Sequence, residues 1–408
     1  GKIAEKYSDK IYLTDDNPRN ENPTYIRKNI KKGINKNRIR ELPNRKRAIH
    51  EAIMNLNTGE LLLVAGKGHE KFQDYGKKKL FFSDEQVILK SIKSKNKSLS
   101  KDLRLNIIKE ESKAKISNKL IVKNISINSK RIKKNDIFFA IKGKRVDGNK
   151  FVSEALKKKS CLAIVNRLNK NYPLIRQVKV KDTLNFLTQC SSIYRENINT
   201  KIISITGSCG KTTLKEMIGH TLKTISKTSY SPKSFNNKYG VPISLFNLKQ
   251  NDQFGVFEVG MDKRGEIDNL TKIIKPDLGI ITNISYAHAK NFNKISQIAE
   301  AKAEIMNNIK KDGTVLLNMD DSFYNYHKNF AVKKKLKIIS FGIKNKSSTT
   351  KLVKIKKIGN KYELFINVNG LYLSFYSLND NQSHLYNILA TLASINSLTD
   401  VKKLKKDI

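Results

Sequence analysis

Short apolar segments alternate with amphipathic stretches through much of the second half of the chain. Strands that alternate with helices are typical of a parallel, doubly wound sheet, because each crossover helix covers one face of the sheet. We therefore predict an α/β fold with a mostly parallel sheet here. The apolar segments lie at 201–206, 254–259, 278–284, 314–317 and 336–341, and helical periodicity is visible near 211–224 and 295–310.

The pattern changes after residue 350. Residues 351–378 alternate between polar and apolar positions, and turn signals occur at Gly359-Asn360 and at 367–370. This pattern predicts antiparallel strands joined by tight turns. An apolar stretch at 384–396 predicts a last helix.

The start of the chain predicts a small α/β unit. Apolar runs at 9–14 and 60–65 predict two strands. Helical periodicity at 24–32 and 45–56 predicts two helices between them. A helix that starts near Ser83 then fades into a run of Lys, Ser and Asn, which indicates a linker.

A second small α/β unit follows this linker. Apolar runs at 137–141 and 162–165 predict strands, and a helix is expected to start between them at Phe151. We therefore expect a Rossmann-like tail domain, a linker, a second small domain, a large central domain and a short remainder. Their boundaries are predicted at 1–95, 96–101, 102–198, 199–400 and 401–408.

The composition limits what the protein can be. The chain has 408 residues and a net charge of +44, and 38% of its residues are hydrophobic, which is enough for packed cores. Lysine, asparagine and isoleucine are abundant and tryptophan is absent, as A/T-rich codon usage would produce. Because the basic residues are spread along the whole chain, we interpret them mostly as solvated surface and expect no nucleic-acid partner.

The sequence carries no signal for a membrane or an oxidising compartment. No apolar run approaches the roughly 18 residues that a membrane-spanning helix needs. The first residues lack the apolar core of a signal peptide. Cys161, Cys190 and Cys209 lie far apart and fit neither a disulfide framework nor a zinc site. We therefore expect a cytoplasmic protein without a membrane partner.

One glycine-rich motif predicts a phosphate-binding loop between an apolar strand and a helix. Glycines let backbone N–H groups approach phosphate oxygens, and the helix N-terminus adds partial positive charge. Lys211 would reach the β- and γ-phosphates of ATP, and the Thr212 hydroxyl would bind Mg²⁺. The motif consists of Gly207, Ser208, Cys209, Gly210, Lys211, Thr212 and Thr213.

Three further residues are candidates for the same site. Glu258 ends one apolar segment and His288 follows the next, so both are expected at the carboxyl edge of the sheet, where such sheets bind ligands. A carboxylate there is a natural Mg²⁺ ligand, and a histidine can hold metal or phosphate. A surface glutamate and a structural histidine are the alternatives. Lys302 lies on a predicted helix, and its position alone predicts an exposed lysine.

Residues 102–408 resemble the Mur ligases, because these motifs and others occur in the order and spacing of that family. The segment before the phosphate-binding loop resembles the family's UDP-sugar domain. The matching segments are 128–131, 136–143, 147–148, 207–213, 236–242, 258–261, Asn283 with 287–288, 301–304, 318–320 and His384 with Asn387.

The resemblance implies an ATP-dependent amide ligase of peptidoglycan precursor synthesis. The motifs are most similar to those of the ligases that add D-alanyl-D-alanine to UDP-MurNAc-tripeptide through an acyl phosphate. In that family, Lys211 and Thr212 would serve ATP and Mg²⁺, and Glu258 and His288 would hold metal. Lys302 would be carbamylated, which turns a cation into a carboxylate-like metal partner.

The resemblance also implies roles for residues outside the metal site. Asn236 and Asn237 would line the phosphate region. The adenosine would be contacted by Asn318, His384 and Asn387. The UDP-sugar would be held by Ser129, Lys130 and Arg131.

Residues 1–95 resemble a different Mur ligase domain, the C-terminal domain of the ligase that adds diaminopimelate. The resemblance rests on the sequence Asp-Asn-Pro-Arg at 16–19 and Gly-Lys-Gly-His-Glu at 66–70. It implies that Arg19 clasps a carboxylate of the incoming amino acid and that Asn17 donates a hydrogen bond nearby. Gly66 and Glu70 would meet the distal end of the amino acid.

The C-terminal domain of the family would follow residue 400 and is absent from this sequence. We therefore expect a fragment of a longer fused or read-through chain, in which neither half turns over alone, and we expect a monomer. Another ligase of the superfamily, similar to folylpolyglutamate synthase, is an alternative. A basic nucleic-acid-binding ATPase and a scaffold role are the alternatives from other classes.

Overall fold

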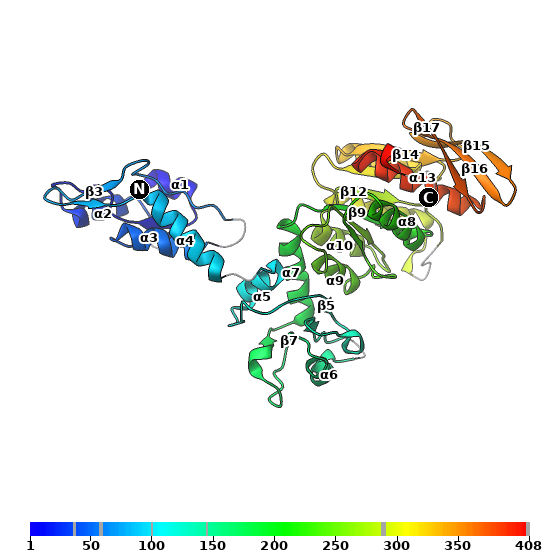
Figure 1. Cartoon of the computed structure of the whole chain (residues 1–408). Helices are drawn as coiled ribbons and strands as arrows, with labels where there is room; N and C mark the ends of the chain where they lie inside the picture. Colours follow the sequence, from blue (N-terminus) through cyan, green and yellow to red (C-terminus); the bar gives the residue numbers. More distant parts are fainter. Residues whose placement is uncertain (36–37, 57–59, 99–100, 144–145, 287–290, 405–408) are drawn as a thin grey trace. The chain divides into compact units, whose positions relative to one another are not determined.

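The computed structural model describes residues 1–35, 38–56, 60–98, 101–143, 146–286 and 291–404. The chain divides into two compact units (Figure 1). The first unit comprises residues 1–106 and 117–120, and the second comprises 107–116 and 121–408. Helix α5 (Leu103–Ser112) lies across this division in sequence. The predicted boundary near residue 198 falls inside the second unit and remains a prediction.

The first unit is a small α/β arrangement whose helices pack around two short strand pairs. Strand β1 pairs with β2 in parallel, and β3 pairs with β4 in antiparallel. The buried Arg45–Asp84 ion pair (2.6 Å) joins α3 to α4. The elements are α1 (Lys2–Tyr7), β1 (Ile11–Leu13), α2 (Pro23–Lys31), β2 (Ile39–Glu41), α3 (Arg45–Met54), β3 (Phe72–Asp74), β4 (Lys79–Phe81) and α4 (Asp84–Ser98).

Two predictions for the first unit were wrong. The apolar run at 60–65 belongs to no strand of the described chain, and the side chains of Leu61 and Leu63 are 94% and 83% exposed. The carbonyl oxygen of Ala65 accepts a hydrogen bond from the Arg45 side chain (2.9 Å) in place of a neighbouring strand. Helix α4 continues to Ser98, so the predicted linker begins as helix.

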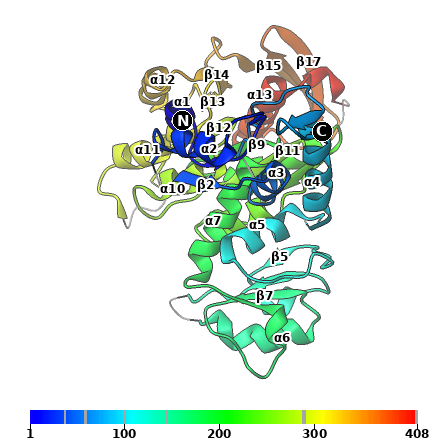
Figure 2. The same cartoon turned by 90° about the vertical axis from the view of Figure 1, so that its left-hand side faces the viewer.

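The second unit contains a four-stranded parallel sheet in the order β5-β6-β7-β8. Helix α6 lies beside this sheet (Figure 2). It packs against Phe138 and Ala163 on one face of the sheet. Helix α7 covers the other face, where Phe186 stacks on Phe139. The elements are β5 (Ile125–Ser126), η2 (Ser129–Arg131), β6 (Ile137–Phe139), η3 (Gly148–Phe151), α6 (Val152–Lys157), β7 (Leu162–Val165), η4 (Leu174–Arg176), β8 (Gln177–Lys179) and α7 (Thr183–Glu196).

The larger sheet of the second unit contains nine strands within the described ranges. Its order is β10-β11-β9-β12-β13-β14-β15-β16-β17, and neighbours from β10 to β15 are parallel. Strands β15 to β17 form the antiparallel meander that the alternating pattern predicts. The strands are β9 (Lys201–Thr206), β10 (Thr228–Tyr230), β11 (Phe254–Glu258), β12 (Leu278–Ile281), β13 (Thr314–Asn318), β14 (Lys337–Gly342), β15 (Thr350–Ile358), β16 (Lys361–Val368) and β17 (Leu371–Ser377).

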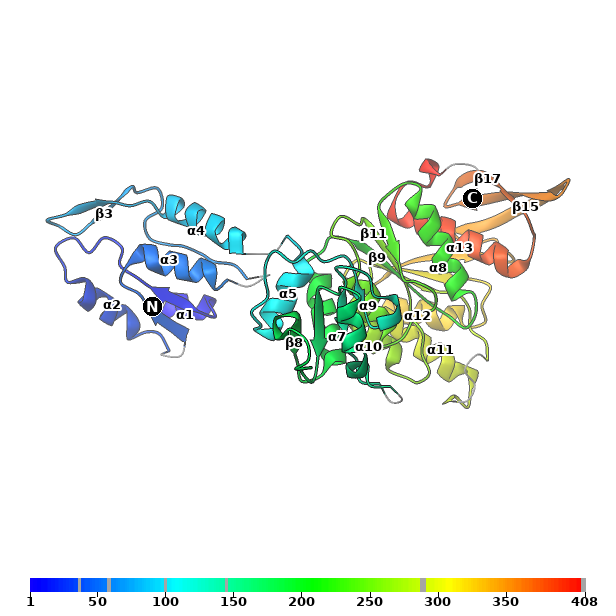
Figure 3. The same cartoon turned by 60° about the horizontal axis from the view of Figure 1, so that its bottom comes forward.

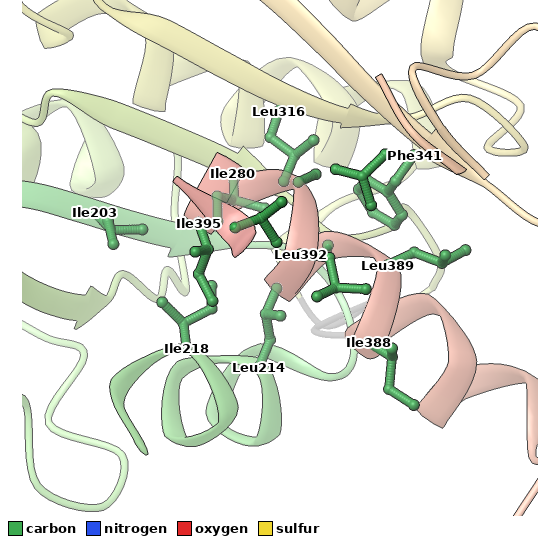
Figure 4. Close-up of a cluster of buried hydrophobic side chains, with 14 of the residues drawn as sticks. Ile203, Leu214, Ile218, Ile280, Leu316, Phe341, Ile388, Leu389, Leu392 and Ile395 are labelled. Carbon is green, nitrogen blue, oxygen red and sulfur yellow. The ribbon is translucent and has the colours of Figure 1, made fainter. Parts of the chain in front are cut away.

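Helices α8 and α13 lie side by side on one face of this sheet (Figure 3). Leu214 and Ile218 of α8 meet Leu392 and Ile395 of α13 above the sheet (Figure 4). On the opposite face, η6 lies over β12, where a Cβ on Gly279 would meet the Ile309 side chain. The helices are α8 (Lys211–Lys223), α9 (Gly240–Phe246), α10 (Glu266–Ile274), α11 (Ile295–Ala303), η6 (Glu304–Asn308), α12 (Tyr324–Lys333), α13 (Gln382–Leu398) and η7 (Val401–Lys403).

The architecture confirms the predicted α/β class with a mostly parallel central sheet. The parallel strands are buried on both faces, as continuous apolar runs predict. Across the described residues, none of the helices combines the length and apolar character needed to cross a bilayer.

Candidate active site

The glycine-rich loop joins the end of β9 to the start of α8, as predicted. Gly207 has φ +146°, and a Cβ there would lie 1.8 Å from the Thr282 hydroxyl oxygen, so only glycine fits. Gly210 is the N-cap of α8, with φ +79°. The loop therefore presents backbone N–H groups at the N-terminus of a 13-residue helix, where anions bind favourably.

The loop is braced by the segment that follows β12. The backbone N–H of Cys209 donates to Asn283 Oδ1 (2.9 Å), and the Cys209 carbonyl accepts from the Thr282 hydroxyl (2.7 Å). Ser208 is buried and exchanges hydrogen bonds with the backbone of Ser285. Cys209 itself is exposed, and Thr213 is exposed on the first turn of α8.

Lys211 folds back over this loop. Its Nζ donates to the carbonyl oxygens of Gly207 (2.9 Å) and Ser208 (3.2 Å). The ammonium group is therefore held where the loop would wrap a polyphosphate. A phosphate oxygen is a stronger, charged acceptor than these carbonyls.

Three predicted residues from three elements meet beside the loop. The Thr212 hydroxyl donates to Glu258 Oε2 (2.7 Å), and Asn236 Nδ2 donates to Glu258 Oε1 (2.7 Å). Thr212 lies in the first turn of α8, Glu258 ends β11, and Asn236 lies after β10. Glu258 is 1% exposed, so its carboxylate is held in one orientation by both neighbours. The surface-glutamate alternative is excluded.

The donor set of this cluster fits Mg²⁺. A carboxylate and a hydroxyl are the hard oxygen ligands that Mg²⁺ takes, usually together with waters and substrate phosphates. Within the described ranges, no three His, Cys, Asp or Glu side chains gather in a way that could hold a metal on their own. His288, the remaining predicted metal ligand, lies outside the described residues.

Lys302 is buried, which corrects the expectation of an exposed lysine. The residue is 2% exposed, and its Nζ donates to the carbonyl oxygen of Gly207 (2.8 Å). Burial, with a smaller contribution from the positive charge of Lys211, lowers the pKa of Lys302 to about 7. The surface interpretation failed because helix α11 turns this side chain toward the loop and away from solvent. A large fraction of Lys302 is therefore the neutral, nucleophilic amine near neutral pH.

The N-terminal part of α13 lies next to the same loop. A Cβ on Gly210 would be 3.3 Å from Asn387 Oδ1, so this predicted adenosine residue is near the loop. His384 is half-buried one turn earlier. Asn318 is buried at the end of β13, where its amide donates to the Thr282 carbonyl (3.2 Å).

Asn237 differs from its neighbour Asn236. Its Oδ1 accepts hydrogen bonds from the backbone N–H groups of Tyr239 (3.1 Å) and Gly240 (3.0 Å). Its side-chain oxygen thus caps the turn that leads into α9.

The residues predicted to hold the UDP-sugar form one 3₁₀ turn, η2. The Ser129 hydroxyl donates to Glu154 Oε2 (2.7 Å), whereas Lys130 and Arg131 are exposed. Arg131 lines a cavity of about 270 Å³ that also includes the aromatic side chains of Tyr230 and Phe235. The cavity lies between η2 and the segments around β10 and α9.

The two motifs of the first unit lie next to each other, and their binding of an amino acid stays a prediction. Asn17 Nδ2 donates to Glu70 Oε2 (2.6 Å), although the two residues are 53 positions apart. Gly66 has φ +117°, and a Cβ there would lie 2.8 Å from Asp16 Oδ2. Arg19 is exposed and has φ +52°, so the turn displays its guanidinium to solvent.

Two buried lysines that hold these sites together were not singled out from the sequence. Lys67 Nζ contacts Asn17 Oδ1 (2.9 Å) and Glu70 Oε2 (3.1 Å) and so joins the two motifs of the first unit. Lys215 is fully buried on α8 and contacts the segment after β10. Lys67 lies within the motif at 66–70, but nothing in the sequence marks the burial of either lysine, because a lysine is ordinarily a surface residue.

Family models of three Mur ligase domains match the chain. The Mur ligase middle domain matches residues 205–395, and the Mur ligase family catalytic domain matches 121–195. The Mur ligase glutamate ligase domain matches residues 1–68. The order of these matches places a glutamate ligase domain before the other two.

Curated relatives match a large part of the chain. The chain is 34% identical over 261 residues to the UDP-N-acetylmuramoyl-tripeptide–D-alanyl-D-alanine ligase of Rickettsia prowazekii, covering 63% of this chain and 57% of the relative. It is 36% identical over 227 residues to the ligase of the same name from Buchnera aphidicola subsp. Acyrthosiphon pisum, covering 56% of this chain and 49% of the relative. The chain thus spans about half the length of these relatives.

Solved structures agree with this result. A crystal structure of MurF from Acinetobacter baumannii matches with a TM-score of 0.63 and 26% identity, covering 74% of this chain and 68% of that one. MurF ligase from Thermotoga maritima in complex with ADP matches with a TM-score of 0.59 and 26% identity, covering 70% and 66%. The three domain matches, the relatives and the central sheet agree, and the chain belongs to the Mur ligase family.

Proposed function

We propose that this chain provides the ATP site and the UDP-sugar site of a ligase that joins D-Ala-D-Ala to UDP-MurNAc-tripeptide. The observation that carries the proposal is the contact of Thr212 with Glu258 beside the glycine-rich loop (2.7 Å). This contact supports an Mg²⁺ site, because a hydroxyl and a carboxylate are ligands that Mg²⁺ takes together with nucleotide phosphates. The names of the relatives supply the substrates.

The reaction would proceed through an acyl phosphate. The γ-phosphoryl group of ATP passes to the tripeptide carboxylate and leaves ADP. The amine of D-Ala-D-Ala then attacks the acyl carbon and loses a proton, and the tetrahedral intermediate expels inorganic phosphate to leave the amide. The residues of the chain position the reactants and neutralise charge in this reaction.

Each residue of the loop region would have a defined part. Lys211 exchanges its carbonyl partners for phosphate oxygens and balances their charge. Thr212 and Glu258 hold Mg²⁺, which would neutralise phosphate charge, and Asn236 orients Glu258. Asn318, His384 and Asn387 would contact the adenosine.

Lys302 would act as a carbamate. Its neutral amine attacks carbon dioxide and loses a proton, so a cationic side chain becomes an anionic one with two oxygen ligands. The low pKa of Lys302 (about 7) supports this step, because only the neutral amine reacts. His288 remains a proposed metal ligand from the family resemblance.

The cavity beside η2 would receive part of the UDP-sugar. The exposed cations Lys130 and Arg131 suit the diphosphate, and Ser129 fixes the turn through Glu154. The aromatic rings of Tyr230 and Phe235 line the same cavity and can pack against a base or sugar.

The first unit would be the domain of a diaminopimelate-adding ligase that binds the incoming amino acid. Arg19 would clasp a carboxylate, while Asn17 and Glu70 are already joined by a hydrogen bond beside Gly66. The glutamate ligase domain match at 1–68 supports this assignment. We further propose that the chain acts as a cytoplasmic monomer, since its cysteine usage suits a reducing compartment.

Calorimetric titration tests the proposed function. UDP-MurNAc-tripeptide is titrated into the chain with Mg²⁺ and a non-hydrolysable ATP analogue, and the Lys211→Ala variant is measured in parallel. We expect the wild-type chain to bind both ligands and the variant to lose the ATP analogue while it retains the UDP-sugar.

The other outcomes favour the alternatives. A chain that binds the ATP analogue and a folate in preference to the UDP-sugar would support a ligase similar to folylpolyglutamate synthase. Binding to RNA or DNA that falls steeply with salt, without UDP-sugar binding, would support a nucleic-acid-binding ATPase.

A further inference from the structure

Lys215 is a buried cation that the proposed mechanism does not use. Its side chain is 0% exposed on α8, one helical turn after Lys211. Its Nζ donates to the carbonyl oxygens of Ser231 (2.7 Å) and Lys233 (2.6 Å) and forms an ion pair with Glu216 Oε1 (2.8 Å). An ammonium group has three N–H donors, and these three acceptors account for all of them.

The two carbonyls belong to a tight segment that leaves β10. Lys233 has φ +47°, a left-handed conformation that a lysine adopts at a cost in free energy. Pro232 lies between the two carbonyls and has no N–H to donate. The segment therefore turns both oxygens toward Lys215, and removing the ammonium would leave the Ser231 carbonyl without this partner inside the protein.

This segment delivers Asn236 to the metal-binding carboxylate. The backbone N–H of Phe235 donates to the Pro232 carbonyl (3.2 Å), which tightens the turn before Asn236. Asn236 Nδ2 then donates to Glu258 Oε1, and the Asn236 carbonyl accepts from the Gly260 N–H (2.8 Å). A Cβ on Gly260 would lie 3.0 Å from the Asn236 amide group, so the fit is close.

We propose that Lys215 is a positioning residue: its ammonium clamps residues 231–233 and so fixes Asn236 against Glu258. This inference rests on the proposed function, because it concerns the site for ATP and Mg²⁺. One helix then carries the hydroxyl that meets Glu258 directly and the lysine that orients Glu258 from its other side. The two oxygens of the carboxylate are thereby fixed by the same element.

The test compares Lys215→Met with Lys223→Met. The Nζ of Lys215 lies 6.0 Å from the centre of the Tyr230 ring. Lys223 is an exposed lysine of the same helix whose Nζ lies 4.2 Å from that centre, so it controls for the loss of a cation near the ring. The first measurement is the affinity for the ATP analogue with Mg²⁺ and with a chelator in place of Mg²⁺. The second is amide hydrogen exchange at Phe235 and Asn236.

We expect Lys215→Met to lower the Mg²⁺-dependent gain in affinity by about 10- to 100-fold, as the loss of a partner behind a metal ligand does. The affinity without Mg²⁺ stays near that of the wild type, because Lys211 and the loop are intact. Exchange at Phe235 and Asn236 becomes faster. Lys223→Met changes neither measurement, and Asn236→Ala reproduces the loss of the Mg²⁺-dependent gain.

Two results would overturn the inference: an unchanged exchange rate at Phe235 and Asn236, or an equal loss of affinity with and without Mg²⁺. If Lys215→Met does not fold, Lys215→Gln keeps a donor at the buried position but is too short to reach both carbonyls, and the same two readouts decide. A wild-type chain that binds no nucleotide contradicts the proposed function instead. Wild-type binding with an unchanged Lys215→Gln contradicts only the role of Lys215.

Discussion

At the scale of single residues, the carbonyl oxygen of Gly207 is the point where two lysines of the proposed nucleotide site meet. It accepts hydrogen bonds from Lys211 (2.9 Å) and from Lys302 (2.8 Å), so two amines converge on one neutral acceptor. When both amines are protonated, their positive charges repel each other, and burial removes the water that would screen this repulsion. The repulsion between the two ammonium groups decreases when one lysine loses its proton or when an anion binds between them.

The stability of the second unit should therefore depend on the protonation of Lys302. The folded pKa of Lys302 is lowered to about 7, so between this pH and the ordinary lysine pKa the unfolded chain binds the extra proton. Stability should rise as the pH increases from about 7 toward 10, and Lys302→Met should flatten this rise. Urea denaturation at a series of pH values measures it. An equally steep rise in Lys302→Met would show that another group is responsible.

The sequence motifs predicted where several candidate site residues lie in the fold. Lys211 and Thr212 follow directly from the glycine-rich loop, and the position of Glu258 at a strand end follows from the apolar run before it. The burial of Lys302 could not be predicted from its own helix, because its partner, Gly207, lies 95 positions earlier in the sequence. The turn-capping contact of Asn237 could not be predicted from the motif, and its role in the phosphate region stays a prediction.

At the scale of elements, helix α13 follows the antiparallel meander and reaches the glycine-rich loop. Its apolar side chains pack on α8 and on the sheet, and its first turns bring Asn387 next to Gly210. The hydroxyl of Tyr386 donates to Asp320 Oδ2 (2.9 Å), which ties the same turn to the end of β13. Packing and side-chain contacts together fix the helix relative to the loop.

A cavity between α13 and α8 should weaken the second unit. Leu392 is 0% exposed within this core, so Leu392→Ala should lower the free energy of unfolding by about 2–5 kcal/mol. Urea denaturation followed by circular dichroism measures the change. Leu378→Ala is the control, because its side chain is 77% exposed and the expected change is within about 0.5 kcal/mol. Equal effects of the two substitutions would contradict the importance of this packing.

The sequence predicted strands correctly at several segments with a clear pattern of apolar residues. The run at 162–165 is strand β7 (Leu162–Val165), and the alternating segment 351–378 is the meander β15 to β17. The run at 60–65 has the same apolar character but forms no strand in the described chain. A strand needs a neighbour with free backbone groups, and periodicity within one segment does not report whether a neighbour is there.

At the scale of the whole molecule, the chain is built from two compact units, each with its own buried apolar residues. The three domain matches follow the order tail, small domain and central domain that the motifs predict. The lysine- and serine-rich run lies near the end of α4, whereas the two units divide between residues 106 and 107, within α5. The close association of the two later domains in one unit was not foreseen, since contacts such as Asn247 with Ile125 join distant segments (2.7 Å).

Two separate unfolding transitions are therefore expected. Arg45→Met breaks the buried pair with Asp84 and leaves a carboxylate without its partner, which should cost about 3–5 kcal/mol and shift only the transition of the first unit. The ATP analogue at about 100 times its dissociation constant should stabilise only the second unit, by about 2.7 kcal/mol.

Differential scanning calorimetry resolves these transitions. The control substitution is Arg104→Met. Arg104 pairs with Asp102 (Nη2 to Oδ2, 2.7 Å) at a less buried position, so we expect a smaller shift of the transition temperature. A single transition that moves as one with both perturbations would show that the two units unfold cooperatively.

The exposed leucines of residues 60–65 have a consequence for how long the protein survives in a cell. A segment that belongs to no strand of the described chain and exposes two leucines is accessible to proteases and to the apolar surfaces of other chains. Cleavage there would separate the motif at 16–19 from the motif at 66–70 while the nine-stranded sheet stays intact. Degradation would therefore begin in the first unit. The half-life of the intact chain would depend on cleavage of this segment and not on the unfolding of the second unit.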